Sequence, residues 1–131
     1  MIFLDTSFII ALSLKNHAKN SRAVEIWSSI ENEKKITSKL IVGEVWNVLN
    51  TRLKVNMELM DKVYKFIYIT STVLNDYYYE EMGVEQLKLY YPERLPFNDC
   101  VYMAIMEDLK IKKIVSFDKH FDLNKNIERI H

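Results

Sequence analysis

Cysteine, glycine and proline are scarce in this sequence of 131 residues, which contains one cysteine, two glycines and two prolines. A single cysteine excludes a disulfide framework and a zinc site built on cysteines, and it is typical of a protein in a reducing cytoplasm. Cys100 lies in the apolar segment DCVYMAIM, so we expect it to be a buried packing residue. The scarcity of glycine and proline disfavours long loops.

The sequence also has no net charge, because 18 basic residues balance 18 acidic ones. Neutrality does not indicate a nucleic-acid binder, although charge segregated on the surface could still provide one. No apolar run approaches the ~20 residues that span a bilayer, so no membrane partner is expected. The amino terminus has no basic segment and Asp5 interrupts its apolar run, so we expect a cytoplasmic protein without a signal peptide.

Apolar periodicity predicts strands that alternate with helices. The predicted strands are residues 2–5, 34–37, 66–72, 112–118 and 127–130. The predicted helices are residues 6–14, 20–33, 38–53, a segment starting at 56, 74–90 and 99–109, with a proline-containing loop at 91–98. Strands separated by helices pair in parallel, with right-handed crossovers. The order therefore predicts an α/β fold, a three-layer α/β/α sandwich around a central, mainly parallel sheet of about five strands.

Three aspartates stand where such a fold could bind a ligand. Asp5 ends the first predicted strand and Asp118 lies just past the segment KIVS of the fourth, so both fall at the carboxyl edge of the sheet, where ligands bind. Asp99 begins the most apolar helix. Each of the three could instead cap the helix or turn that follows, and capping leaves a lone pair free for a metal.

Glu44 is harder to explain as a structural residue. It lies within the apolar stripe of the helix predicted at 38–53, four residues after Leu40 and four before Val48. A charged side chain on that face needs a partner, and the basic residues of the helix, Lys39 and Arg52, are not both on it. This position favours a functional role for Glu44.

Carboxylates gathered in one cleft repel one another unless a cation binds between them. The three histidines are scattered along the chain, so a ligand set of the zinc type is not evident. A site of oxygen ligands favours Mg²⁺ or Mn²⁺. These ions bridge to phosphate oxygens and activate water, so the pattern predicts metal-assisted hydrolysis of a phosphodiester.

The segments around these acids resemble the motifs of a known family. LDTS at 4–7, VGEV at 42–45, NDC at 98–100 and SFDKHF at 116–121 are similar to the acidic motifs of PIN-domain ribonucleases, in particular the VapC-type toxins of prokaryotic toxin–antitoxin pairs. The resemblance covers the whole chain and implies a single PIN-like nuclease domain over residues 1–131 that cleaves RNA with Mg²⁺ or Mn²⁺. It also implies a homodimer and inhibition by a cognate antitoxin.

The resemblance carries residue roles with it. The four acids of the family correspond to Asp5, Glu44, Asp99 and Asp118, which are the predicted catalytic and metal-binding residues. Ser7 and Ser116 correspond to the small polar residues that accompany the first and fourth acids. Asp122 lies one helical turn beyond Asp118 and could share or replace its role.

An RNA strand would need basic groups around the acidic cleft. The candidates are Lys119, His120, Lys39, Arg52, Lys15 and Arg94. Lys119 and His120 are favoured because they flank Asp118, and His120 could act as a general acid or contact a phosphate. An ordinary exposed role is the alternative for each. Aromatic residues could stack on bases, but we favour packing or interface roles for Tyr77, Tyr78, Tyr79, Tyr90, Tyr91, Trp27 and Trp46.

Other functions fit the sequence less well. A phosphatase of the haloacid dehalogenase type needs an aspartate two residues after Asp5, where Ser7 stands. A response-regulator receiver needs an acidic pair near its phosphorylated aspartate, and none lies near Asp5. A non-catalytic PIN-like module that binds RNA or protein, and an RNA-processing nuclease that is not a toxin, remain as alternatives.

Overall fold

The structure, a computed structural model, describes all residues from Met1 to His131. Five short strands form one parallel sheet in the order β3-β2-β1-β4-β5. The strands are β1 (Ile2–Leu4), β2 (Lys35–Ser38), β3 (Thr72–Leu74), β4 (Lys113–Val115) and β5 (Glu128–Ile130). The predicted α/β fold with a parallel sheet is confirmed.

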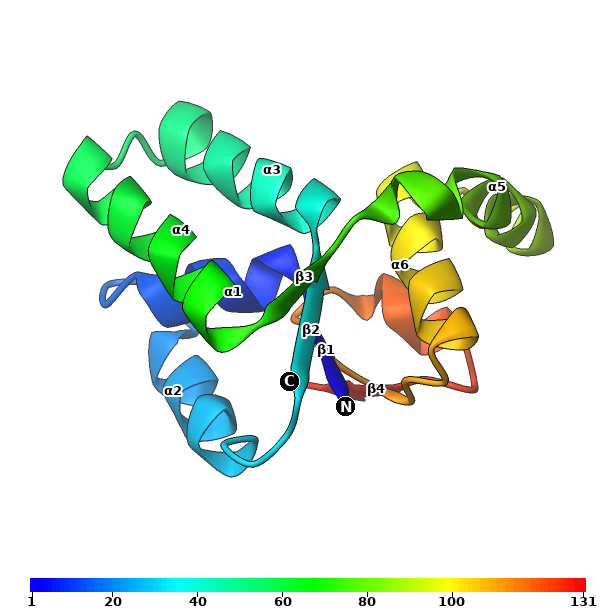
Figure 1. The fold of residues 1–131 in the computed structure, drawn as a ribbon, viewed down its shortest axis with the longest axis horizontal. Coiled ribbons are helices and arrows are strands. Elements are labelled where there is room, and N and C mark those ends of the chain that lie inside the picture. Colours follow the sequence, from blue (N-terminus) through cyan, green and yellow to red (C-terminus); the bar gives the residue numbers. More distant parts are fainter.

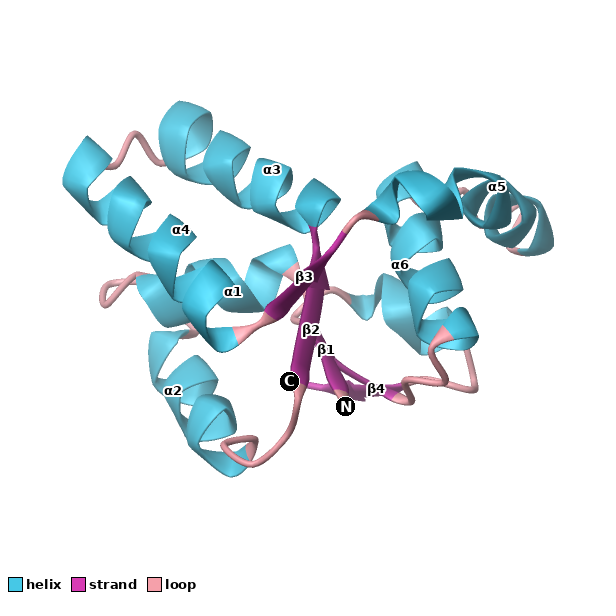
Figure 2. Cartoon of the chain, viewed as in Figure 1, coloured by secondary structure: helices cyan, strands magenta, loops and turns pink.

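Helices cover both faces of the sheet, as Figures 1 and 2 show. One layer contains α1 (Thr6–Ser13), α2 (Asn20–Ser29), α3 (Lys39–Asn47) and α4 (Met57–Thr70), and α3 continues into a π-helical turn, η1 (Val48–Arg52). The other layer contains α5 (Glu80–Leu89) and α6 (Phe97–Asp108). Two short 3₁₀ helices complete the chain, η2 (Asp76–Tyr79) and η3 (Lys119–Leu123).

The centre of the sheet is fully buried. Side chains of β1 are packed on both faces, and Phe3 pairs with Ile36 of β2 on one side and with Ile114 of β4 on the other. On the face opposite α1, every residue of α6 from 99 to 106 is buried, including Cys100. The prediction that this helix is central and that Cys100 is a packing residue is therefore confirmed.

Two side chains fix the point at which α3 begins. Ser38, the last residue of β2, accepts a hydrogen bond from the backbone N–H of Ile41 at 3.5 Å. Asp76 of η2 accepts from the backbone N–H of Leu40 at 2.6 Å. Both bonds satisfy N–H groups that an α-helix leaves unpaired in its first turn. The start of α3 matters because this helix carries Glu44.

The strand predicted at residues 66–72 is wrong over most of its length. Residues up to Thr70 belong to α4, and only Thr72–Leu74 form β3. The apolar residues of this stretch follow a helical period instead, since Met60, Val63 and Ile67 form the buried face of α4. The local preference of isoleucine and tyrosine for strands is overridden by packing of that face.

The helix predicted at residues 74–90 is interrupted. Its first residue, Leu74, ends β3, and the tyrosine-rich segment forms η2 before α5 begins at Glu80. Helix α2 ends at Ser29 rather than near residue 33. The ammonium group of Lys35, which is buried in β2, donates to the backbone oxygens of Ile30, Glu31 and Glu33 and so takes the place of a further helical turn.

The aromatic residues divide into two groups. Trp27, Trp46, Tyr79 and Tyr90 pack against the core, as predicted. Tyr77, Tyr78 and Tyr91 are 76%, 78% and 62% exposed, so a core role is wrong for these three, and an interface role stays a prediction. None of the helices is both long enough and apolar enough to cross a membrane.

Candidate metal centre

Four carboxylates from four separate segments line one cleft of about 540 Å³. Asp5 follows β1 and Asp118 follows β4, and these strands are adjacent and parallel, with Leu4 opposite Val115. Asp99 lies in the first turn of α6, and Glu44 lies in α3. The structure thus brings together the four acidic side chains that the sequence singled out, at the carboxyl edge of the sheet.

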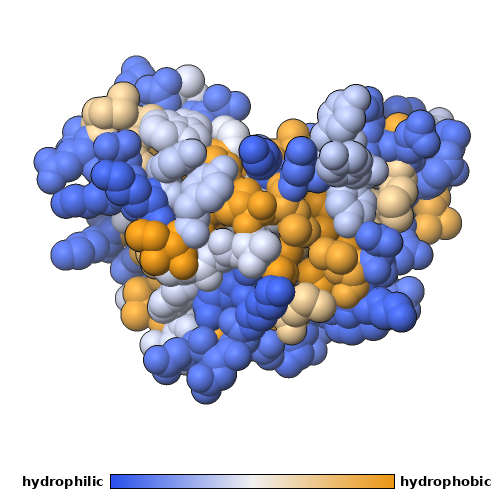
Figure 3. Space-filling model, in the orientation of Figure 1, coloured by the Kyte–Doolittle hydropathy of each residue, from blue (hydrophilic) through white to orange (hydrophobic).

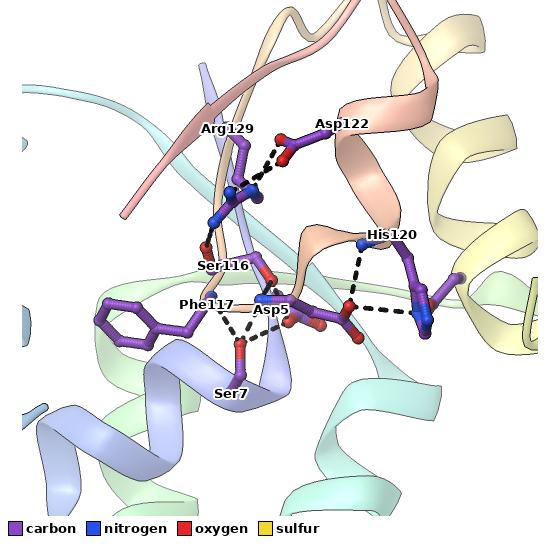
Figure 4. A network of polar contacts seen from close by, with 9 residues as sticks. Asp5, Ser7, Ser116, Phe117, His120, Asp122 and Arg129 are labelled. Carbon is purple, nitrogen blue, oxygen red and sulfur yellow. Dashed lines mark hydrogen bonds and ion pairs between the residues drawn. The ribbon is translucent and has the colours of Figure 1, made fainter. Parts of the chain in front are cut away.

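Asp5 is buried and fixed by two serines, as Figure 4 shows. Its Oδ2 accepts hydrogen bonds from Ser7 Oγ at 2.7 Å and from Ser116 Oγ at 2.6 Å. Each serine oxygen also accepts from a backbone N–H, Ser7 from Phe117 and Ser116 from Asp118. Because an ionised carboxylate can only accept, each serine hydroxyl directs its hydrogen at Asp5. The side chain of Asp5 does not cap α1.

Burial governs the electrostatics of Asp5. Loss of hydration raises the pKa of this carboxyl above its ordinary value, and the charge of Glu44 raises it further. The hydrogen bonds from Ser116 and Ser7 act in the opposite direction, because they stabilise the ionised form. A divalent cation would favour the ionised form more strongly still.

Glu44 is held by three donors from two other helices. Thr6 Oγ1 donates to Oε2, while Asn98 Nδ2 and Tyr102 OH donate to Oε1 at 2.7 and 2.8 Å. Tyr102 is completely buried, and burial together with the charge of Glu44 raises the pKa of its phenol. These bonds account for the position of Glu44 within an apolar stripe and orient its carboxylate along one wall of the cleft.

Asp99, Asp118 and His120 form the tightest group of potential ligands. His120 Nδ1 lies 3.0 Å from Asp99 Oδ2 and 3.1 Å from Asp118 Oδ1. One ligand atom from each residue lies within 4.8 Å of the others. Burial raises the pKa of Asp99 to about 7, the charges of Asp5 and Asp118 raise it as well, and the hydrogen bond with His120 lowers it.

The fourth acid also has a structural role. Asp118 caps η3, since its Oδ1 accepts from the backbone N–H of His120 at 2.9 Å. Asp122 lies elsewhere and turns toward Arg129 in Figure 4. Both oxygens of Asp122 bind the Arg129 guanidinium, at 2.8 and 2.9 Å, and this ion pair lowers the pKa of Asp122. The geometry therefore separates Asp122 from the other acids and leaves Asp118 at the cleft.

The basic residues that line the cleft are mostly not the ones that the sequence suggested for RNA binding. Arg52 lines it, and so do His17 and Lys19, which the sequence analysis did not select. Lys39 and Lys119 are exposed but do not line it, and the same holds for Lys15 and Arg94. The Lys19 ammonium lies 4.7 Å above the ring of Phe117, which holds it beside the acidic group.

This arrangement suits a hydrated divalent cation. Asp5 and Asp99 are buried carboxylates whose pKa values are raised, and Asp118 offers a partly exposed oxygen beside them. Such groups are poorly hydrated as anions, so binding a cation with oxygen preference relieves both their desolvation and their repulsion. The cleft opens to solvent. Lys19, His17 and Arg52, here called the basic rim, line it together with these acids, which leaves room for an anionic substrate.

Comparison with known proteins identifies the class to which this fold and cleft belong. Residues 2–126 match the PIN domain family, so the chain belongs to that family. The 23S rRNA-specific endonuclease VapC20 of Mycobacterium tuberculosis is 28% identical over 127 residues, and the match covers 92% of each chain.

Solved structures agree with this assignment. The crystal structure of Mycobacterium tuberculosis VapC20, described as a sarcin-ricin loop cleaving toxin, has a TM-score of 0.82 at 27% identity, over 94% of each chain. VapBC2 from Rickettsia felis, bound to a DNA fragment from its promoter, has a TM-score of 0.69 over the whole of both chains, and at 14% identity this likeness shows the fold alone. The predicted family and the VapC-type ribonuclease class are confirmed.

Proposed function

We propose that this protein is an endoribonuclease that uses Mg²⁺ or Mn²⁺ to hydrolyse RNA phosphodiester bonds at the cleft of four carboxylates. The observation that carries the proposal is the convergence of four acidic side chains, Asp5, Glu44, Asp99 and Asp118, on the lining of one cleft. Similarity to an rRNA endonuclease over nearly the whole chain supports the same activity.

Each acid has a distinct task in this proposal. Asp99, Asp118 and Asp5 would hold the cation, and Ser7 and Ser116 keep Asp5 oriented toward it. When bound, the ion supplies an activated water and charge stabilisation at the phosphate. Thr6, Asn98 and Tyr102 orient the carboxylate of Glu44, which would add a fourth acidic group beside the cation or its bound water.

The basic rim would hold the substrate. Lys19 and Arg52 line the cleft beside the acids and provide positive charge for the phosphates that flank the cleaved bond, and His17 lines the same cleft. The apolar side chains of Ile10 and Val48 line the same cleft and offer a surface on which a ribose or base can lie. This arrangement favours a single strand or an unpaired loop over a regular RNA helix.

The partners follow from the relationship with VapC proteins. We propose a cognate antitoxin as inhibitor and a cytoplasmic location, where RNA substrates of this kind occur. A homodimer is also proposed, because apolar surface gathers across the middle of the face shown in Figure 3. Ile69, Tyr77 and Tyr78 are 82%, 76% and 78% exposed, so this apolar and aromatic surface is left uncovered within the chain.

The direct test is cleavage of RNA by the metal-free protein after Mn²⁺ or Mg²⁺ is added. The substrates are total RNA, tRNA and 23S rRNA fragments, including the sarcin-ricin loop that VapC20 cleaves. We expect cleavage by the native protein and a loss of at least about a hundredfold in Asp5→Asn, because the metal loses a charged ligand. Asp122→Asn is the matched control and should retain activity. Cleavage that persists in Asp5→Asn or in excess EDTA would refute the proposal.

A further inference from the structure

His120 contributes a nitrogen atom to a group that is otherwise made of oxygens. Its Nδ1 lies almost equally far from Asp99 Oδ2 and Asp118 Oδ1, at 3.0 and 3.1 Å. The imidazole therefore points between the two carboxylates rather than toward solvent, although 46% of the side chain is exposed. Spacings of about 3 Å are those of neighbouring ligands around one small cation.

The local backbone fixes this orientation. Asp118 caps η3 by accepting from the backbone N–H of His120, so the carboxylate and the imidazole that it faces are set by the same turn. Phe121, the next residue, is fully buried and anchors the turn to the core. His120 thus contacts Asp99, 21 residues away in sequence, from a turn that is capped by Asp118 and anchored by Phe121.

A nitrogen ligand changes which cation a site prefers. Mg²⁺ is a hard ion that binds oxygen and gives up its water reluctantly. Transition metal ions accept imidazole readily, and their affinity for mixed nitrogen and oxygen sites exceeds that of the alkaline-earth ions. A site of carboxylates alone would not separate Mn²⁺ from Mg²⁺ in this way.

We propose that His120 is a metal ligand of this centre, together with Asp99 and Asp118, and that it makes the protein prefer Mn²⁺ to Mg²⁺. The inference rests on the proposed function, because it concerns the cation of the same site. It goes further in naming a nitrogen ligand and the choice of ion. His17 offers the natural comparison. It lines the same cleft, but its Nδ1 accepts a hydrogen bond from the backbone N–H of Lys19 and does not contact the acids.

Two measurements on the untagged, metal-free protein test the proposal. Calorimetric titration with Mn²⁺ and with Mg²⁺ gives both affinities for the native protein, His120→Gln and His17→Gln. We expect His120→Gln to bind Mn²⁺ about tenfold more weakly and Mg²⁺ with less than about a twofold change, because only a transition metal ion loses a preferred ligand. The His17→Gln variant should match the native protein for both ions.

Pulsed electron paramagnetic resonance of the Mn²⁺ complex reads the ligand directly. The native protein and His17→Gln should show coupling of the manganese to ¹⁴N, and His120→Gln should not. Absence of ¹⁴N coupling in the native complex, or parallel losses for both ions in His120→Gln, would overturn the role of His120. That result would leave the proposed nuclease intact provided that Asp99→Asn still abolishes binding. Failure of the native protein to bind either ion would refute the metal-dependent function itself.

Discussion

At the scale of single residues, the ionised form of Asp99 is the electrostatically least favourable part of the metal-free candidate centre. This carboxyl is 8% exposed and lies beside two other acids, so its ionised form is unfavourable without a cation. A native pKa near 7, against an ordinary value of 3.8, means that folding favours the protonated form. The contribution of Asp99 to stability is therefore full below pH 4 and is lost as the pH rises through 7.

We expect Asp99→Asn to stabilise the metal-free protein at pH 8 while abolishing its activity. The gain should be on the order of 1 kcal/mol or more and should vanish near pH 4, because asparagine has no proton to lose. Urea unfolding of both proteins between pH 4 and pH 8 measures the difference. Asp61→Asn, at an exposed carboxylate of α4, is the control and should show no such trend. Equal stabilities of native protein and Asp99→Asn at pH 8 would contradict the account.

The sequence was informative for residues whose position was already unusual. Asp5 and Asp118 follow buried strands, and Glu44 lies in an apolar stripe. Capping could explain the two aspartates, whereas local structure supplied no explanation for Glu44. The hydrogen-bond donors to Glu44 were not predictable in the same way. Thr6, Asn98 and Tyr102 meet Glu44 from 38, 54 and 58 residues away. Nothing in their own segments marks them as hydrogen-bond donors to a carboxylate.

At the scale of elements, the close approach of α5 to α6 depends on one glycine. A Cβ at Gly83 would lie 2.7 Å from Val101 Cγ2 and 3.3 Å from Val101 Cα. The backbone of α6 cannot move freely there, because its buried face carries Asp99 into the cleft. Gly43, in the exposed face of α3, has no atom within 4 Å of the same position.

These two glycines predict opposite effects of one substitution. Gly83→Ala should lower the free energy of unfolding by about 1–3 kcal/mol, because overpacking forces the helices apart. Gly43→Ala should raise it by about 0.5–1 kcal/mol, since alanine is the better helix former and meets nothing. Chemical denaturation of both variants gives the comparison. A neutral Gly83→Ala would show that the α5–α6 contact adapts at little cost.

Prediction of elements succeeded where packing and local preference agreed. β1 and α6 combine an apolar run with clear boundaries, and the structure has them close to where the sequence placed them, whereas β4 ends at Val115, three residues before the predicted strand end at 118. β3 was misplaced because Phe66–Thr70 is rich in residues that favour strands, whereas the face formed by Val63 and Ile67 must pack against the sheet as a helix. The strand itself is only three residues long, too short for periodicity to indicate.

At the scale of the whole molecule, a net charge of zero conceals an uneven distribution around the cleft. Four acids line it together with two cationic side chains, Lys19 and Arg52, and with His17. The protein as a whole would not attract RNA from a distance, so binding must depend on the local positive rim. RNA phosphates held there release counterions, which makes the interaction sensitive to salt.

The double variant Lys19→Ala with Arg52→Ala tests whether this rim, rather than the basic residues selected from the sequence, holds the RNA. We expect KM to rise about tenfold with kcat changed less than about threefold, because uniform binding is lost while the acids stay in place. The dependence of log(kcat/KM) on log[salt] should become shallower by about 1.4, which corresponds to two phosphate contacts on a single strand. Lys65→Ala with Lys88→Ala removes the same charge from exposed sites on α4 and α5 and should change neither quantity. If both double variants behave alike, the strand does not follow the rim, and contacts through Lys39 or Lys119 become the stronger hypothesis.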